Sequence, residues 1–313
     1  MTDAQKQEMQ MQMLMRMLQQ QQLSHGGHHG GHHGGQHSHD GVNFHDANHG
    51  APDPGMHSHD GVNFHGSHGS EGHHEEPKDE PGIFAERVLP YTATEGREWG
   101  SKAFTIGIAG PVGSGKTTLL KKLCSRFSKD HSMAVIINDL YTTLDGEGVI
   151  ASGVLPSDRV KALTTGIWSR VAIDEDIEDN FTVAEAVSKK FDAEFMVIEA
   201  AGDNLGANFD RNLSDFTIFV LDTAAGEQAP LKGGKGVTQA DLLVLNKTDL
   251  APLCGVKLDV LEANARKMRG EGPVMLAQVG KDVGVDAIVN AVLAQFEKSG
   301  AKAFYEARTK SKK

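Results

Sequence analysis

Cysteine is scarce in this sequence, because only Cys124 and Cys254 occur among 313 residues. Two cysteines build no disulfide framework, which excludes the small disulfide-stapled secreted domains and indicates a reduced compartment. Also lacking are an apolar stretch long enough to span a membrane and, near the N-terminus, an apolar run followed by a small-residue cleavage site. We therefore expect a cytoplasmic protein that does not enter membranes.

Positive charge is in deficit as well. The chain has 31 lysines and arginines against 42 aspartates and glutamates, which leaves a net charge of −11. An acidic protein offers no general partner to nucleic acid or to anionic membranes. We therefore expect neither as a ligand.

Histidine is nearly missing from most of the chain. Fifteen of the 16 histidines lie between His25 and His74, and only His131 follows them. Such uneven composition separates a tail from a folded domain. We expect a disordered Met/Gln- and His/Gly-rich extension over 1–80, a linker over 81–100, a folded domain over 101–300 and a basic C-terminal tail over 301–313.

The extension contains one nonapeptide, His-Ser-His-Asp-Gly-Val-Asn-Phe-His, twice, at His37–His45 and His57–His65. Low hydrophobicity with abundant glycine predicts disorder, and clustered neutral imidazoles bind nickel, zinc, copper and cobalt without selecting among them. The candidate ligands for Ni²⁺ or Zn²⁺ are His25, His28, His29, His32, His33, His37, His39, His45, His57, His59 and His65. The alternative is a tail that only keeps the chain soluble.

A glycine-rich stretch, Gly110-Pro-Val-Gly-Ser-Gly-Lys-Thr117, has the G-x-x-x-x-G-K-T spacing of a phosphate-binding P-loop. It follows the apolar run Phe104–Ala109 and opens a helix predicted over about Lys116–Ser128, which is the context that the motif requires. Backbone N–H groups and the start of the helix would bind the phosphates. Lys116 would reach the β- and γ-phosphates, and the hydroxyl of Thr117 would coordinate Mg²⁺.

Short apolar runs alternate with helical periodicity through the rest of the domain. This alternation predicts an α/β fold of the P-loop NTPase type, with a mostly parallel sheet covered by helices on both faces. The predicted strands are Phe104–Ala109, Ala134–Ile137, Val160–Leu163, Phe195–Ile198, Phe216–Leu221, Leu242–Leu245 and Val274–Ala277. The further predicted helices are Val171–Lys190, Leu258–Arg269 and Val285–Phe296.

Two of the predicted strands are followed by acidic residues, Asp139 and Glu199. Phosphate-handling residues gather at the carboxyl ends of parallel strands, and a carboxylate there can hold Mg²⁺ or its waters. Either acid alone could equally be a helix cap or a solvated strand end, but together, beside a P-loop, they favour the metal. We expect Lys116, Asp139 and Glu199 to be catalytic, and Thr117, Asp139 and Glu199 to hold Mg²⁺.

The stretch Asn246-Lys247-Thr248-Asp249 follows the predicted strand Leu242–Leu245. A carboxylate such as Asp249 accepts hydrogen bonds from N1–H and the N2 amino group of guanine, whereas adenine presents an acceptor at N1. The pattern therefore predicts GTP as the nucleotide. The candidate nucleotide-binding residues are Gly110, Pro111, Val112, Gly113, Ser114, Gly115, Lys116, Thr117, Thr118, Asn246, Lys247 and Asp249.

With these motifs in place, the sequence resembles the UreG family of urease accessory GTPases. The matching stretches are Gly107–Thr117, Asn138–Thr142, Leu155–Arg159, Glu199–Leu205, Lys232–Gly236 and Asp241–Pro252. The His-rich extension also resembles the N-terminus of eukaryotic members. The resemblance implies a slow, Mg²⁺-dependent GTPase and a GTP-dependent homodimer that, with other urease accessory proteins, incorporates Ni²⁺ into apo-urease.

One stretch departs from the family pattern. After Leu163 the resemblance implies Glu-Thr-Gly-Gly-Cys-Pro-His, with the cysteine and histidine as nickel ligands at the dimer interface. This sequence has Thr164-Thr-Gly-Ile-Trp-Ser-Arg170 instead, so that Trp168 and Arg170 take the ligand positions. Neither an indole nor a guanidinium is an ordinary metal ligand.

Two smaller departures are Ala200-Ala201, where the family has Ser-Gly, and Lys235, where it has proline. Two hypotheses follow. In the first, the chain is a nickel-delivering GTPase whose metal is held by the N-terminal histidines. In the second, it is a GTP-binding paralogue that acts as a scaffold or regulator, with a tail that only buffers metal.

Overall fold

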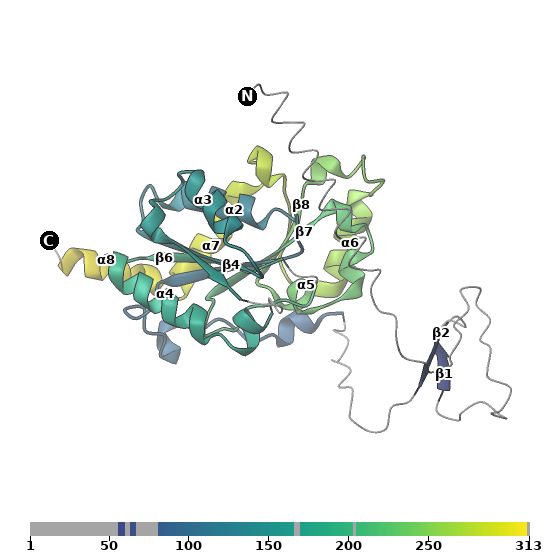
Figure 1. The fold of residues 1–313 in the computed structure, drawn as a ribbon, viewed down its shortest axis with the longest axis horizontal. Helices are drawn as coiled ribbons and strands as arrows, with labels where there is room; N and C mark the ends of the chain where they lie inside the picture. Colours follow the sequence, from purple (N-terminus) through teal and green to yellow (C-terminus); the bar gives the residue numbers. More distant parts are fainter. Residues whose placement is uncertain (1–55, 60–62, 67–80, 166–169, 203–204, 312–313) are drawn as a thin grey trace, which may run out of the picture. The chain divides into compact units, whose positions relative to one another are not determined.

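The computed structural model describes residues 56–59, 63–66, 81–165, 170–202 and 205–311, and the chain divides into two units, Met1–His74 and Glu75–Lys313 (Figure 1). In the first unit two short strands, β1 (Met56–His59) and β2 (Asn63–Gly66), pair antiparallel and extend one residue beyond each end of the second copy of the nonapeptide. A pair of this length is marginally stable on its own. Of the candidate metal-ligating histidines, His57, His59 and His65 lie in these two strands, and the other eight lie outside the described residues.

The second unit is built on a seven-stranded parallel sheet, which confirms the predicted fold class. Its strands are β3 (Phe104–Ala109), β4 (Met133–Asp139), β5 (Val160–Thr164), β6 (Phe195–Glu199), β7 (Phe216–Asp222), β8 (Leu242–Asn246) and β9 (Val274–Leu276). All seven predicted strands occur. Their order across the sheet is β5-β4-β6-β3-β7-β8-β9, so β3 lies in the middle and its carboxyl end is flanked by the ends of β6 and β7.

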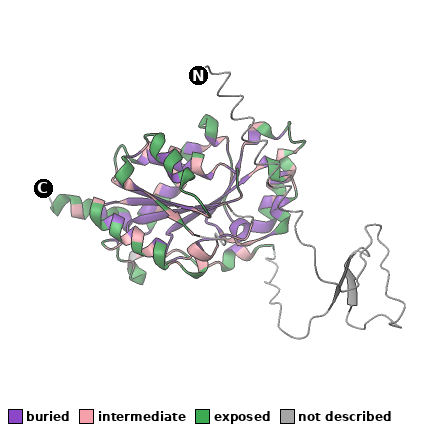
Figure 2. Cartoon of the chain, in the orientation of Figure 1, coloured by how far each residue is buried: buried purple, intermediate pink, exposed green. Residues whose placement is uncertain are grey.

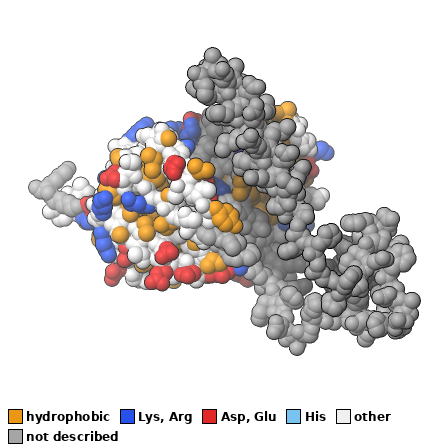
Figure 3. Space-filling view, viewed as in Figure 1, with side chains coloured by type: hydrophobic (Ala, Val, Ile, Leu, Met, Phe, Trp, Pro, Cys, Tyr) orange, Lys and Arg blue, Asp and Glu red, His pale blue; other side chains and the backbone are white. Residues whose placement is uncertain are grey.

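Helices cover both faces of the sheet, and the strands between them are buried (Figures 1 and 2). One face carries α2 (Lys116–Phe127), α3 (Leu144–Ala151), α7 (Val285–Lys298) and α8 (Ala301–Ser311), and the other carries α4 (Glu178–Phe191), α5 (Lys235–Gln239) and α6 (Leu258–Arg269). In the described part of the chain, no helix has both the length and the apolar character that a membrane crossing demands. The face in Figure 3 carries both charge signs, with acidic side chains along its lower edge.

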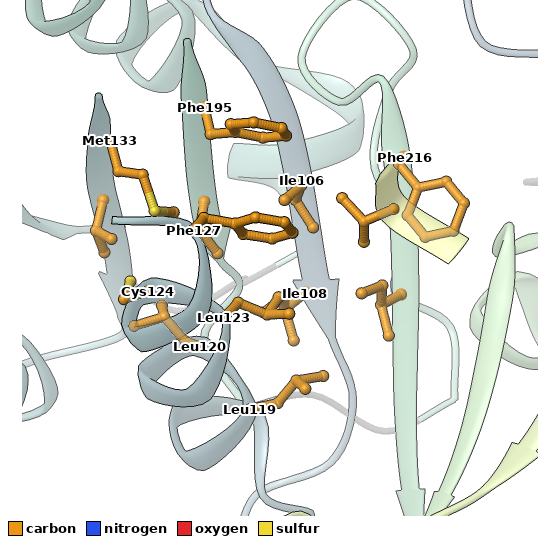
Figure 4. Close-up of a cluster of buried hydrophobic side chains, with 14 of the residues drawn as sticks. Ile106, Ile108, Leu119, Leu120, Leu123, Cys124, Phe127, Met133, Phe195 and Phe216 are labelled. Atoms are coloured by element: carbon orange, nitrogen blue, oxygen red, sulfur yellow. The ribbon is translucent and has the colours of Figure 1, made fainter. Parts of the chain in front are cut away.

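The core between α2 and the sheet holds the first turn of α2 in place. Phe127 at the end of α2 stacks on Phe195 of β6 with 4.7 Å between ring centroids, while Leu119 and Leu123 lie beside Ile108 of β3 (Figure 4). Burying large apolar side chains of this kind contributes about 1.5–3 kcal/mol for each of them. The helix is thereby fixed along its length to two neighbouring strands, β3 and β6.

The helix predicted over Val171–Lys190 is interrupted, so the prediction of one continuous helix is wrong. A π-helical turn spans Val171–Glu175, and α4 begins only after a two-residue break. Ile173 in this turn is fully buried, and its carbonyl oxygen accepts a hydrogen bond of 2.8 Å from the N–H of Asp210. The turn is therefore held by a neighbouring loop instead of continuing the axis of α4.

The segment predicted as a linker over 81–100 is packed against the domain. The ring of Phe84 is buried between two guanidinium groups, 3.7 Å from Arg87 and 4.8 Å from Arg269. Trp99 at the other end of the segment is buried in the core on the α2 side. Such stacking contributes both apolar burial and cation–π attraction.

Two buried carboxylates depend on the same segment. Asp215 is fully buried, and its Oδ1 and Oδ2 atoms accept hydrogen bonds of 2.9 and 3.2 Å from Arg97. The ammonium of Lys102 lies 3.5 Å from Asp215, and burial lowers the pKa of Lys102 to about 8. Asp241 is likewise buried, with Arg87 of the segment 3.4 Å away and Arg211 of the domain 2.6 Å away.

The C-terminal segment, predicted only as a basic tail over 301–313, forms helix α8. Ala301 and Tyr305 lie one helical turn apart and are both buried. The hydroxyl of Tyr305 donates a hydrogen bond of 3.0 Å to the carbonyl oxygen of Trp99. Helix α8 therefore belongs to the core on the α2 side.

We expect a chain that begins at Pro81 to keep the stability of the domain and a chain that begins at Ser101 to lose much of it. The shorter chain lacks the buried rings of Phe84 and Trp99, each of which contributes about 1.5–3 kcal/mol by burial. It also lacks Arg87 and Arg97, so that Asp241 keeps only Arg211 and Asp215 keeps only Lys102 as charged partners. Urea unfolding followed by circular dichroism makes the comparison, with the exposed Glu86→Ala as the control in the longer chain. Equal unfolding midpoints for the two chains would show that the segment is only a linker.

Candidate nucleotide-binding site

The predicted P-loop connects β3 to α2 at the carboxyl edge of the sheet. Gly110 and Gly115 both have positive φ, 142° and 105°. There is also no room for a side chain, because a Cβ on Gly110 would lie 2.2 Å from the carbonyl oxygen of Val220 and one on Gly115 would lie 2.4 Å from Nδ2 of Asn246. Only glycine fits at these two positions, and a curled glycine loop at a helix start is suited to binding phosphate.

Lys116 and Thr117 begin α2, and the structure brings Thr117 together with a predicted acid. The hydroxyl of Thr117 donates a hydrogen bond of 2.7 Å to Oε1 of Glu199, which ends β6. The ammonium of Lys116 donates to the carbonyl oxygen of Pro111 at 3.1 Å, so it is folded back over the loop. The structure thus brings together two of the three side chains that are predicted to hold Mg²⁺.

The carboxyl group of Glu199 is buried, which disfavours its charged form. Its side chain is 2% exposed, and its Oε2 atom has no hydrogen-bond partner among the described residues. Burial raises the pKa of Glu199 to about 7, although the hydrogen bond from Thr117 acts in the opposite direction. A buried carboxylate oxygen beside a threonine hydroxyl is a donor set suited to Mg²⁺.

Asp139 lies near this pair but faces its own loop. Its Oδ1 atom accepts a hydrogen bond of 2.7 Å from the N–H of Leu140, and its Oδ2 atom accepts one from the hydroxyl of Thr142. The register of β4 and β6 puts Ile137 beside Glu199, so Asp139 lies two residues farther along the edge. Glu199 and Asp139 thus lie at the ends of neighbouring strands, with Asp139 two residues farther in the strand direction.

A buried amide pair that sequence reasoning missed ties these strand ends together. Asn138 and Asn180 exchange hydrogen bonds of 3.1 and 2.9 Å between their side chains. Nδ2 of Asn138 also donates to the carbonyl oxygen of Glu199, and Nδ2 of Asn180 donates to that of Ala172 in the π-helical turn, both at 3.0 Å. No sequence signal pointed to Asn180, because a polar residue in a helical pattern normally faces solvent.

The predicted guanine loop is hydrogen-bonded to the P-loop. Nδ2 of Asn246 donates to the carbonyl oxygen of Ser114 at 2.9 Å, and Oδ1 of Asn246 accepts from the N–H of Val279 at 3.0 Å. Asp249 lies 2.8 Å from the ammonium of Lys281, whose hydrogen bond lowers the pKa of Asp249. The carboxylate is therefore ionised and acts only as an acceptor, as guanine recognition requires. Sequence reasoning also missed Lys281.

The stretch that departs from the family pattern is described in part. Trp168 lies outside the described residues, and Arg170 pairs with Glu175 at 2.7 Å. Among the residues that the structure describes, no three His, Cys, Asp or Glu side chains are grouped so that they could hold a metal ion. Cys124 is buried, and burial raises its pKa to about 12, while Cys254 is exposed.

Residues 104–276 match the CobW/HypB/UreG nucleotide-binding domain. This stretch is more than half of the chain, and it contains the P-loop, both acidic strand ends and the predicted guanine loop. The chain belongs to the CobW/HypB/UreG family. The match covers the three branches of this family together.

Two solved structures of hydrogenase maturation factors have a similar fold. HypB from Archaeoglobus fulgidus is 20% identical, with a TM-score of 0.53, over 62% of this chain and 90% of that one. HypB from Helicobacter pylori, solved in complex with nickel, is 22% identical, with a TM-score of 0.53, over 64% of this chain and 90% of that one. At these identities the likeness supports the fold and not a particular function.

We expect Glu199→Gln to stabilise the metal-free and nucleotide-free chain at pH 8 and to have no such effect below pH 4. Folding raises the pKa of Glu199 from 4.5 to about 7. The free energy of unfolding of the wild type therefore falls as the pH rises from about 4.5 to 7, and it remains at the lower value above pH 7. Glutamine keeps the acceptor for Thr117 and removes this penalty, on the order of 1–3 kcal/mol.

Urea unfolding at several pH values, with a chelator present, measures this difference between variant and wild type. Glu194→Gln, at a half-buried carboxyl at the opposite end of β6, is the control. A stability difference that does not change with pH would contradict the assignment of a buried, unpaired charge to Glu199.

Proposed function

We propose that this chain is a Mg²⁺-dependent GTPase that acts as a urease accessory metallochaperone, coupling GTP hydrolysis to the incorporation of nickel into urease. One observation carries the GTPase part of the proposal. The P-loop, the Thr117–Glu199 pair and the Asn246–Asp249 loop, which are far apart in the sequence, converge at one edge of the sheet through direct hydrogen bonds. Phosphate, cation and base would thus be bound by adjoining parts of a single surface.

Each residue has a role in this proposal. The backbone of the P-loop and Lys116 bind the phosphates, and Thr117 with Glu199 holds Mg²⁺, which supplies positive charge to the phosphate oxygens. Asp139 holds waters of the ion, since it lies farther along the edge than Glu199. Hydrolysis is slow, and Lys116, Asp139 and Glu199 are the catalytic residues.

We expect Asp249→Asn to change the base preference of the enzyme without abolishing binding. Xanthine has a carbonyl oxygen at C2 where guanine has an amino group, so an amide side chain can donate to it. The variant should hydrolyse XTP better than GTP, with a loss of GTP affinity of about 10²–10⁴-fold. Competition between labelled GTP and unlabelled GTP, XTP and ATP measures the preference, with Asp259→Asn on α6 as the control. Unchanged preference for GTP would contradict guanine recognition by Asp249.

The nickel part of the proposal rests on the extension and on the family. The extension carries fifteen histidines, and a family member of similar fold has been solved with nickel. Because the described residues hold no group of metal-binding side chains, nickel would be held by the N-terminal histidines. A GTP-dependent homodimer would then act in the cytoplasm with other urease accessory proteins on apo-urease.

The second candidate function is that of a GTP-binding scaffold or regulator. Arg170 favours it, because a guanidinium in the position of a nickel ligand repels a divalent cation. In this case the extension buffers metal and takes no part in delivery. The nucleotide site would be the same in both functions.

We expect the full chain to bind several Ni²⁺ ions and a chain beginning at Pro81 to bind none tightly, as measured by isothermal titration calorimetry. Adding the full chain, GTP and nickel to apo-urease with its other accessory proteins should then raise urease activity, whereas the shorter chain should not. Activation by both chains would place metal delivery outside the histidines. Activation by neither would favour the scaffold function.

A further inference from the structure

We propose that Asp222, to which the sequence motifs assign no role, is a positioning residue for the nucleotide. It fixes the ammonium of Lys247 against the P-loop and thereby joins the base-binding loop to the phosphate-binding loop. This inference rests on the proposed binding of GTP and extends it to a residue outside the P-loop and the Asn246–Asp249 stretch.

The sheet order explains why a third residue is needed. β7 lies between β3, which leads into the P-loop, and β8, which leads into the Asn246–Asp249 loop. Asp222 is the last residue of β7 and lies beside Asn246 in the register of the two strands. A side chain that extends from Lys247 to the P-loop must therefore pass the end of β7, where Asp222 is placed.

The contacts follow this path. Nζ of Lys247 lies 2.8 Å from Oδ2 of Asp222 and donates a second hydrogen bond, of 2.5 Å, to the carbonyl oxygen of Gly113. Asp222 is 14% exposed and Lys247 is 35% exposed, so the carboxylate is the better shielded partner. One ammonium thus holds a strand end and the P-loop at the same time, using two of its three donors.

The backbone of Lys247 is also held in an uncommon conformation. Its φ is 58°, in the left-handed region that residues with a side chain rarely adopt. The hydroxyl of Thr223, the residue after Asp222, donates a hydrogen bond of 3.0 Å to the carbonyl oxygen of Lys247. Two successive residues at the end of β7 therefore fix Lys247, one through its backbone and one through its ammonium.

This arrangement bears on phosphate binding. While it accepts the hydrogen bond from Lys247, the carbonyl oxygen of Gly113 points at that ammonium. A carbonyl oxygen turned toward a phosphate would instead repel the phosphate. If Asp222 is removed, Lys247 loses its fixed position and Gly113 loses a fixed donor. Binding of GTP and of GDP should weaken together, because both nucleotides carry the phosphates that the loop surrounds. Base preference should stay the same, because Asp249 determines it.

We expect Asp222→Ala to raise the dissociation constants of GTP and GDP by the same factor, about tenfold, mostly through faster dissociation. Asp222→Asn, which keeps an acceptor oxygen, should recover part of the loss. In the Lys247→Ala background the same substitution should change affinity less than twofold. Stopped-flow fluorescence with labelled GTP and GDP gives the rates, and the melting temperature of the free chain reports folding.

Glu262→Ala is the matched control, because it removes an ion pair with Arg266 on α6 and should leave both affinities unchanged. Equal losses in the wild-type and Lys247→Ala backgrounds, no loss at all, or a loss confined to GTP would overturn the role of Asp222 while leaving the proposed GTPase in place. Failure of the wild-type chain to bind guanine nucleotides would overturn both.

Discussion

The nucleotide site depends on the close approach of Gly110 to the carbonyl oxygen of Val220, where a Cβ atom would be 2.2 Å away. This contact lets the chain leave the buried centre of the sheet and turn beside β7 without a side chain between them. α2 then starts at the edge, with Thr117 within hydrogen-bond distance of Glu199. β3 is buried between two cores, one on each face of the sheet, and α2 packs in one of them, so both elements that flank this turn are fixed.

The same edge combines a rigid scaffold with an unbalanced charge. Glu199 is buried, raised in pKa and left with one oxygen unpaired among the described residues, while the Asn138–Asn180 pair fixes the backbone at its carbonyl. A protein interior normally satisfies such a group, because an unpaired buried polar atom costs about 1–3 kcal/mol. The cost is retained here at a strand end next to a P-loop, where a divalent cation would remove it. The strain of the free chain and the proposed affinity for Mg²⁺ thus have one cause.

Sequence patterns predicted the parts of the structure whose causes are local. Apolar runs located the seven strands, and glycine spacing located the P-loop, because burial and backbone freedom act residue by residue. The break before α4 and the packing of 81–100 were not predicted, because Ile173 is anchored by Asp210 and Arg97 by Asp215, 118 residues away. Asn180 and Asp222 were missed for the same reason. Their partners are 42 and 25 residues distant, and a single sequence carries no sign of such pairs.

The departures from the UreG pattern are connected in the structure. Arg170, in the position of a metal ligand, pairs with Glu175, and Lys235, in place of a proline, pairs with Asp174 at 3.3 Å. Both cations are thus matched by consecutive acids, Asp174 and Glu175, of one π-helical turn. Since the described residues supply no group of metal ligands, coupling between GTP and nickel in the proposed function would act on how the domain presents the N-terminal histidines to its partners.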